Sequence, residues 1–348
     1  MMVMPKTSKD KHNLWVDNVK VFACLLVALG HFFKSMVASQ MISESYVYTW
    51  FVETIYWFHV PLFFICSGYL YQKYSQVNSF GSWKSNVIKK LLNLGIPYVV
   101  FSIATWTLKN IFSGDVNTQN DASMCDTLFN QPLAPYWYLY ALFFIFLITP
   151  TFSNKTMAFS GVFIALNFKV VYLLVGELPV YMVSTVLNNE IWFVFGMLLA
   201  FFEKPIMSYR SKLKRIGLLG IVIWLGVSFT IPWFHLEADW LSFLMGIVVC
   251  ATLLMVFINF SVSNQWIKWL CKYTMPIFLM HTIFAAGLRS VLFRLGIENL
   301  WIHLVVGIGI SIIGPMMAAK IMELTKLDVL YAPGKYIKLK KEKGKNNG

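Results

Sequence analysis

Near the N-terminus, a long apolar stretch decides the fold class: residues 14–34 read LWVDNVKVFACLLVALGHFFK. A helix needs about 20 mostly apolar residues to cross the roughly 30 Å hydrocarbon layer of a bilayer. The apolar part, Val19 to Met36, also has the length of a signal-peptide core. However, Asp17 and Lys20 stand at its start, no small-residue cleavage site follows it, and further apolar runs come after it. We therefore predict that it is retained as a first membrane-spanning helix.

The composition of the whole chain agrees with a membrane protein. Of its 348 residues, 58% are hydrophobic and 13% are charged, and the net charge is +13. A soluble domain is roughly 45–50% apolar with glycine included and about 25% charged, so a soluble globule and a disordered chain are both excluded. The positive charge alone would suit a nucleic-acid binder, but so apolar a chain is better explained by cations in membrane loops. The five cysteines form no CxxC pair, so neither a disulfide framework nor a metal site is predicted.

Apolar segments of similar length recur along the chain. The predicted spans are 14–36, 48–71, 91–112, 136–152, 157–175, 188–202, 213–232, 240–260, 271–291 and 300–323. Lys169, Glu177 and Pro179 interrupt the fifth and sixth of them. We predict an all-α integral membrane protein, a bundle of about ten transmembrane helices. Residues 1–13 would form a cytoplasmic tail, residues 14–323 the membrane domain and residues 324–348 a basic cytoplasmic tail.

Loop charges predict the orientation of this bundle, since short cytoplasmic loops are enriched in lysine and arginine. With the N-terminus inside, the inner segments hold Lys6, Lys9, Lys11, Lys73, Lys84, Lys89, Lys90, Lys155, Lys204, Arg210, Lys212, Lys214, Arg215, Lys268 and Lys272. The outer loops hold Asp115, Asp121, Asp126, Glu177, Glu190, Glu237, Asp239 and Glu298, against Arg294. Both termini are therefore predicted to be cytoplasmic. The six lysines from Lys335 to Lys345 suggest a solvated tail beside anionic lipid.

The first predicted helix carries its polar residues on one face. Lys20 and His31 are eleven residues apart, so the two side chains point within about 20° of each other and lie about 16 Å apart along the axis. Asp17 lies about 40° from His31 on the same stripe and is a helical neighbour of Lys20. A lone histidine on an apolar face is usually a satisfied core residue. Aligned ionisable residues within a membrane span more often mark function, so we predict a functional role for His31.

Other predicted spans carry further polar residues. Glu53 lies at a depth similar to that of His31, so its carboxylate could orient the imidazole; it could equally bond a tyrosine or tryptophan at the interface. His281 lies mid-span and would be either a second polar wall of a cavity or a buried structural histidine. His12, His235 and His303 lie in tails, loops or span ends and are given no role.

Two adjacent lysines, Lys89 and Lys90, precede the third predicted span. Such residues usually anchor a helix at the cytoplasmic surface. They could also hold a phosphorylated cytosolic ligand beside Lys20, because ammonium groups bind phosphates as point charges.

These motifs resemble the acyltransferase 3 family of membrane O-acyltransferases, in whose first helix an arginine, ten residues and a histidine recur. Here Lys20 replaces the arginine and His31 supplies the histidine. DNVK at 17–20 with LGH at 29–31, and FHVPLFF at 58–64 with SGY at 67–69, look most similar to the fucose O-acetylase-like branch. Weaker matches follow in order: Lys89-Lys90 to Pro97, YWYLYAL at 136–142 to Pro150, Trp192-Phe193 to Gly196, and IFLMH at 277–281.

The resemblance implies about ten membrane helices and transfer of an acyl group, commonly acetyl from cytosolic acetyl-CoA. The acceptors would be sugars of surface polysaccharides or lipid-linked glycans, at the plasma membrane. By this similarity His31 would be the essential catalytic histidine, and the acyl donor would bind at Lys20, Lys89 and Lys90. The sequence leaves open whether Glu53 or Asp17 is the partner of His31. Candidate substrate contacts are Asp17, His59, Trp137 and His281. Acyl-CoA would be a substrate, and no resident cofactor, metal or nucleic acid is expected.

The sequence departs from the family pattern at two points. Asn93 stands where many relatives carry a second arginine, and no hydrolase-like domain follows the predicted spans. We therefore expect the membrane part alone to handle the acceptor.

The implied chemistry suits these residues. A sugar hydroxyl that attacks a thioester needs a base of near-neutral pKa, which histidine has, in a dry pocket with donors for the developing oxyanion. The alternative is a transporter or flippase for a glycan or lipid, since polar residues that line a helix bundle also serve transport. A membrane sensor without chemistry would leave the stripe of Lys20 and His31 unexplained.

Overall fold

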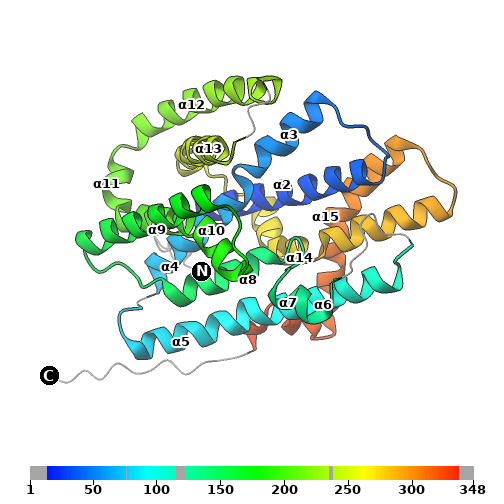
Figure 1. The fold of residues 1–348 in the computed structure, drawn as a ribbon, viewed down its shortest axis with the longest axis horizontal. Helices are drawn as coiled ribbons and strands as arrows, with labels where there is room; N and C mark the ends of the chain where they lie inside the picture. Colours follow the sequence, from blue (N-terminus) through cyan, green and yellow to red (C-terminus); the bar gives the residue numbers. More distant parts are fainter. Residues whose placement is uncertain (1–13, 76, 115–121, 235–237, 337–348) are drawn as a thin grey trace, which may run out of the picture.

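In the computed structural model, the protein is a bundle of α-helices (Figure 1). The structure describes residues 14–75, 77–114, 122–234 and 238–336, and this part contains no β-strand. The predicted all-α membrane fold is therefore confirmed. Some predicted features lie outside the described residues: those at Lys6, Lys9, Lys11, His12, Asp115, Asp121, His235 and Glu237, and the tail after Tyr336.

Nine helical segments of the described chain are long and apolar enough to cross a bilayer. They are α2 (Leu14–Ala38), α3 with α4 (Tyr46–Tyr56 and His59–Tyr74), α5 with α6 (Phe80–Lys90 and Ile96–Ile111), α9 (Lys155–Val175), α10 (Tyr181–Phe201), α12 (Arg210–Thr230), α13 (Asp239–Phe260), α14 (Gln265–Arg294) and α15 (Leu300–Leu324). Shorter connecting helices are α7 (Met124–Phe129), α11 (Glu203–Ser208) and η2 (Pro232–Phe234).

The fourth predicted span, 136–152, forms a shorter helix. This helix, α8 (Trp137–Ile148), has 12 residues. At 1.5 Å per residue it is about 18 Å long, less than the roughly 30 Å hydrocarbon layer. It ends where Thr149 becomes extended ahead of Pro150, as expected of a residue before proline. The described chain thus has nine long spans and one short apolar helix in place of ten similar ones.

The second predicted span, 48–71, is divided into α3 and α4 at Trp57 and Phe58. Pro61 lies in the first turn of α4. A proline has no N–H for the helix ladder, and its ring clashes with the preceding turn, so a new helix starts there.

The third predicted span, 91–112, also departs from a regular helix. It begins as a π-helical turn, η1 (Leu91–Gly95), and continues as α6, which has Pro97 at its start. The missing N–H of this proline explains the irregular turn before it.

The sixth span, α10, begins at Tyr181, earlier than the predicted start at residue 188. The predicted span 188–202 already contains Glu190, whereas the loop charges predicted this residue in an outer loop; in the structure it lies inside α10, 4% exposed. That prediction is wrong. The hydroxyl of Thr149 lies 2.6 Å from Glu190 Oε1 and 2.7 Å from Ile145 O, so its one proton is shared between two acceptors. This contact ties one carboxyl oxygen to α8, while Glu190 Oε2 is buried without a partner among the described residues. Lys169 likewise continues α9 without a break and donates to Asn188 Oδ1.

The centre of the bundle is formed by α2, α4, α10 and α14. Helix α4 packs on α10 and α2, and α14 packs on α2 and α15. Two glycines bring α4 and α10 close together: a Cβ at Gly68 would lie 1.9 Å from Phe193 O, and a Cβ at Gly196 would lie 1.9 Å from Ile65 O. Helices α9 and α12 lie at the edge and expose mostly apolar side chains, as expected of lipid-facing helices.

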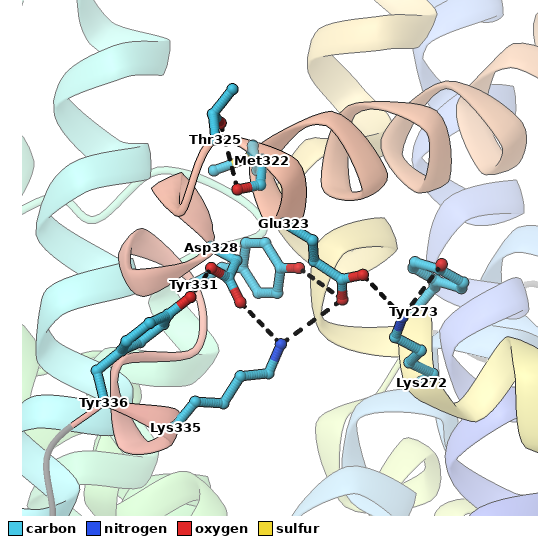
Figure 2. Close-up of polar contacts among 9 residues, drawn as sticks. All are labelled: Lys272, Tyr273, Met322, Glu323, Thr325, Asp328, Tyr331, Lys335 and Tyr336. Carbon is cyan, nitrogen blue, oxygen red and sulfur yellow. Dashed lines mark hydrogen bonds and ion pairs between the residues drawn. The ribbon is translucent and has the colours of Figure 1, made fainter.

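Two short turns after α15, η3 (Leu327–Leu330) and η4 (Pro333–Lys335), are tied to the bundle by a charged network. Figure 2 shows Glu323 and Asp328 beside the ammonium groups of Lys272 and Lys335. Lys272 Nζ lies 2.8 Å from Glu323 Oε2, and Lys335 Nζ lies 2.9 Å from Asp328 Oδ2. The side-chain hydrogen bonds from Tyr336 and Lys335 hold the pKa of Asp328 below its usual range.

The same segment reaches the π-helical turn. The backbone N–H of Gly334 donates to Asn93 Oδ1 at 3.0 Å. The sequence predicts Lys335 in a solvated tail, but its ammonium group is paired with two acidic residues, Glu323 and Asp328. Residues up to Tyr336 therefore pack on the bundle.

Candidate active site

Helix α2 carries His31 and Lys20 at opposite ends of one face. The helix is continuous over Leu14–Ala38, so the two residues lie about 16 Å apart along its axis. Gly30 brings α3 close to α2 at this level: a Cβ there would lie 3.0 Å from Ile55 Cδ1 and 3.1 Å from Tyr56 Cε2.

Three histidines from three helices lie close to one another, two of them against Tyr56. The ring centroids of His31 and His281 are 5.3 Å apart. The Tyr56 ring lies 6.3 Å from the His31 ring and 4.6 Å from the His59 ring. We call His31, His59, His281 and Tyr56 the imidazole cluster. Among the described residues, no three His, Cys, Asp or Glu side chains are arranged as metal ligands.

Two of these histidines are held by backbone carbonyls. Nδ1 of His281 donates to Ile277 O at 2.9 Å and to Phe278 O at 3.0 Å, and Nδ1 of His59 donates to Ile55 O at 2.5 Å. Since a carbonyl only accepts, each neutral ring carries its proton on Nδ1 and its lone pair on Nε2. Nε2 of His281 is buried and has no hydrogen-bond partner within the described residues. Burying an acceptor without a donor is unfavourable. This nitrogen is therefore a candidate acceptor for a further hydrogen-bond donor.

His31 differs from the other two histidines. Within the part of the chain that the structure describes, its ring makes no hydrogen bond. It is partly exposed, whereas His59 and His281 are each 1% exposed. The titratable groups that act electrostatically on it are His281, His59 and Lys34. His31 is therefore the most exposed histidine of the cluster.

Two neighbours of His31 were not predicted from the sequence, namely Tyr56 and Lys34. Lys34 follows His31 by one turn of α2, and its Nζ lies 3.8 Å from the centroid of the Tyr56 ring, a cation–π distance. The three-residue spacing from His31 to Lys34 within one helix is a signal that would have found Lys34, whereas Tyr56 lies at the break between α3 and α4 and has no such signal. Lys34 and Tyr56 add an ammonium group and a phenol to the cluster.

The predicted partner Glu53 lies on α3, one turn before Tyr56, and is partly exposed. It is not among the groups that act on His31 in the described chain. The pairing of Glu53 with His31 stays a prediction.

The predicted substrate contact Trp137 lies at the start of α8, partly buried against the main core. Its neighbour Tyr136 donates to Leu279 O at 2.9 Å, which ties α8 to α14 two residues before His281. The structure thus places α8 beside the helix of His281, and the role of Trp137 stays a prediction.

The three lysines predicted to bind the acyl donor gather at the opposite end of α2. Lys90 lies within electrostatic range of Lys20 and Lys89, and its Nζ lies 3.6 Å from the ring centroid of Phe146 on α8. We call Lys20, Lys89 and Lys90 the cation cluster. Asp17, on the same end of α2, lies against Cys271 of α14. Such a group of ammonium ions is suited to a phosphorylated ligand.

Comparison with known proteins places the chain in a family. Residues 13–320 match the family model described as Acyltransferase domain. Nodulation protein NolL of Mesorhizobium japonicum is 24% identical over 139 residues, which make up 40% of this chain and 35% of that protein. The match therefore covers about a third of the length of that relative. No solved structure matches the chain. Because the family model covers most of the sequence, the chain belongs to the acyltransferase domain family, in agreement with the resemblance of its first-helix motif.

Proposed function

We propose that this protein is a membrane O-acyltransferase of the plasma membrane that moves acetyl from cytosolic acetyl-CoA to a sugar hydroxyl, with His31 as general base. The acceptor would be a surface polysaccharide or a lipid-linked sugar. The observation that carries the proposal is the contrast within the imidazole cluster. His59 and His281 are bonded to carbonyls and buried, while His31 is partly exposed and free of such bonds within the described residues. Membership of the acyltransferase family supports the reaction type.

The proposed reaction needs no reagent other than the acyl donor and the acceptor. His31 takes the proton of the acceptor hydroxyl as its oxygen attacks the thioester carbonyl. The developing oxyanion needs nearby donors, and the Tyr56 hydroxyl and Lys34 ammonium group are the candidates. The C–S bond then breaks, and the protonated His31 returns the proton to the CoA thiolate.

His281 would position the base. Its unpartnered Nε2 is an acceptor, and the 5.3 Å between the two ring centroids brings it near His31. If it accepts the N–H of His31, the other nitrogen of His31 keeps its lone pair for the acceptor hydroxyl. His59, Trp137 and Asp17 are proposed substrate contacts.

The donor would be held at the cation cluster. Its phosphates would pair with Lys20, Lys89 and Lys90, and the pantetheine arm would reach along α2 to His31, about 16 Å away. The acceptor would approach from the opposite side of the membrane. Transfer would therefore run across the thickness of the bilayer.

The test is an acetylation assay in cells. A deletion strain is complemented with the natural protein, His31→Ala or His303→Ala, and the acetyl content of its surface glycans is measured by mass spectrometry. Loss of a general base lowers the rate about 10²–10⁴-fold, so we expect no detectable acetylation with His31→Ala. His303 is a suitable control, because it is buried in α15 and bonded to Ile297 O, and its ring contact among the described residues is with Phe293 and not with the cluster. Equal protein levels are checked by immunoblot.

A binding assay separates catalysis from transport. Purified His31→Ala should bind acetyl-CoA as the natural protein does, whereas Lys20→Gln should bind it more weakly. A protein that binds no acetyl-CoA, or normal acetylation with His31→Ala, would contradict the proposal. The first result would favour a glycan or lipid transporter.

A further inference from the structure

A groove between α10 and the α12–α13 pair shares no lining residue with either cluster. Helix α10 packs on α4, α8 and α9, whereas α12 packs on α13. The groove has a volume of about 550 Å³ and also touches α11. Its wall residues are apolar apart from Tyr209 and Lys212 at one end; among them are Leu199, Ile216, Leu254 and Ile258.

The cations at the start of α12 have different surroundings. Nη2 of Arg210 donates to Asn259 O at 3.1 Å, and Lys214 Nζ lies 4.3 Å from the ring centroid of Phe260, so both are held at the end of α13. Lys212 is exposed beside the groove; its Nζ lies 5.9 Å from the ring centroid of Tyr209, and it takes part in no ion pair among the described residues. It is therefore a cation that an outside anion can reach.

At the end of the groove that holds Lys212, the charged residues at the start of α12 are all basic. The first two turns of α12 hold Arg210, Lys212, Lys214 and Arg215 and no acidic residue. Glu203 of the adjacent α11 is paired with Lys73 at 2.9 Å. The loop-charge pattern predicts this end on the cytoplasmic side, where the leaflet carries anionic lipid.

We propose that this groove binds an anionic phospholipid, with an acyl chain between α10 and the α12–α13 pair and the phosphate at Lys212. The apolar walls match a hydrocarbon chain, and the volume lies within the 300–1,000 Å³ typical of ligand pockets. The cation at one end matches a charged headgroup. This inference does not depend on acyl transfer.

The test uses photoactivatable lipids. The purified full chain in vesicles is labelled with phosphatidylglycerol or phosphatidylcholine that carries a diazirine in one acyl chain, and adducts are mapped by peptide mass spectrometry. We expect adducts on α10 and α13 near Leu254, with phosphatidylglycerol preferred about fivefold, the factor for about 1 kcal/mol per lysine near an anionic surface. Lys212→Gln should remove this preference. Lys268→Gln, at the start of α14, should leave it unchanged.

A groove-filling variant tests the place of the acyl chain. Ile216→Trp should reduce labelling with both lipids; Ile216 is 55% exposed, so the larger side chain is compatible with folding. Ile164→Trp on α9, where the isoleucine is 51% exposed outside the groove, is the matched control and should change nothing. Equal capture of the two lipids, or groove adducts that persist with Ile216→Trp, would overturn the proposal.

Discussion

The close contact of α4 with α10 predicts a large loss of stability when a glycine at this contact gains a single methyl group. Replacing Gly196 with alanine adds one methyl group, whose carbon would lie 1.9 Å from Ile65 O, 2.7 Å from Ile65 C and 2.9 Å from Ile65 Cα. These atoms are all backbone, so no side chain can rotate away. The two helices must instead move apart.

The size of the movement follows from the contact distance. Ordinary contact begins at 3.4 Å, so the backbones must separate by about 1.5 Å, which is enough to lose most of the dispersion energy of the close contact. Overpacking of a core costs about 1–3 kcal/mol where side chains can adjust. We therefore expect Gly196→Ala to lower the free energy of unfolding by about 3 kcal/mol or more. Because α4 begins at His59, acetylation should fall as well.

The assay is thermal unfolding of the purified protein in detergent. Gly309→Ala in α15 is the control, because a Cβ there has no atom within 4 Å, and it should be neutral or slightly stabilising. Gly68→Ala presses the same two helices apart, so the double variant should lose less stability than the sum of the two single ones. A Gly196→Ala protein that unfolds at the same temperature as the Gly309→Ala control would refute the close packing of α4 on α10.

Three further changes have expected outcomes. Gly30→Ala should push the Tyr56 ring, 3.1 Å from the new Cβ, away from the cluster. It should lower the acetyl content of the surface glycans in the complementation assay, while the unfolding temperature changes little. The pKa of Asp328 is lowered by donors from a tyrosine and a lysine, so its contribution to stability is present above the ordinary Asp pKa and is lost as the pH falls through the lowered value. Asp328→Asn should remove this acid sensitivity in thermal unfolding measured at a series of pH values. Glu190→Ala should destabilise by about 2–3 kcal/mol because the Thr149 hydroxyl loses its side-chain acceptor and a cavity remains, whereas Glu190→Gln keeps an acceptor and should stay within about 1 kcal/mol.

Much of the fold could be predicted because each span shows its own local signal of length and hydropathy. The departures come from features that hydropathy does not measure. Pro61 and Pro97 break the helix ladder inside apolar segments, and Pro150 ends α8 after 12 residues. Glu190 was misplaced because loop-charge reasoning assumes that acids lie outside the bilayer, while this carboxyl group lies inside the bundle, in contact with a long-range partner, Thr149.

The candidate site could be predicted only in part, because a local sequence pattern does not report which distant helices pack together. The spacing of Lys20 and His31 is a property of one helix, so the sequence is sufficient to place them on one face. The meeting of His31 with His281 joins residues 250 positions apart through the packing of α14 on α2, which no local pattern encodes. The position of Tyr56 depends on the break between α3 and α4.

The arrangement of the three histidines explains why one of them is suited to catalysis. A ring that donates Nδ1–H to a carbonyl is fixed in orientation, and protonating it as well would place a charge in a buried site, as at His59 and His281. His31 has neither constraint among the described residues, and its partial exposure lets a charged imidazolium retain some contact with solvent or substrate. Under the proposed function, the acceptor at His281 Nε2 would stabilise the imidazolium that forms when His31 takes a proton. His281 would then support the reaction without itself removing a proton from the acceptor.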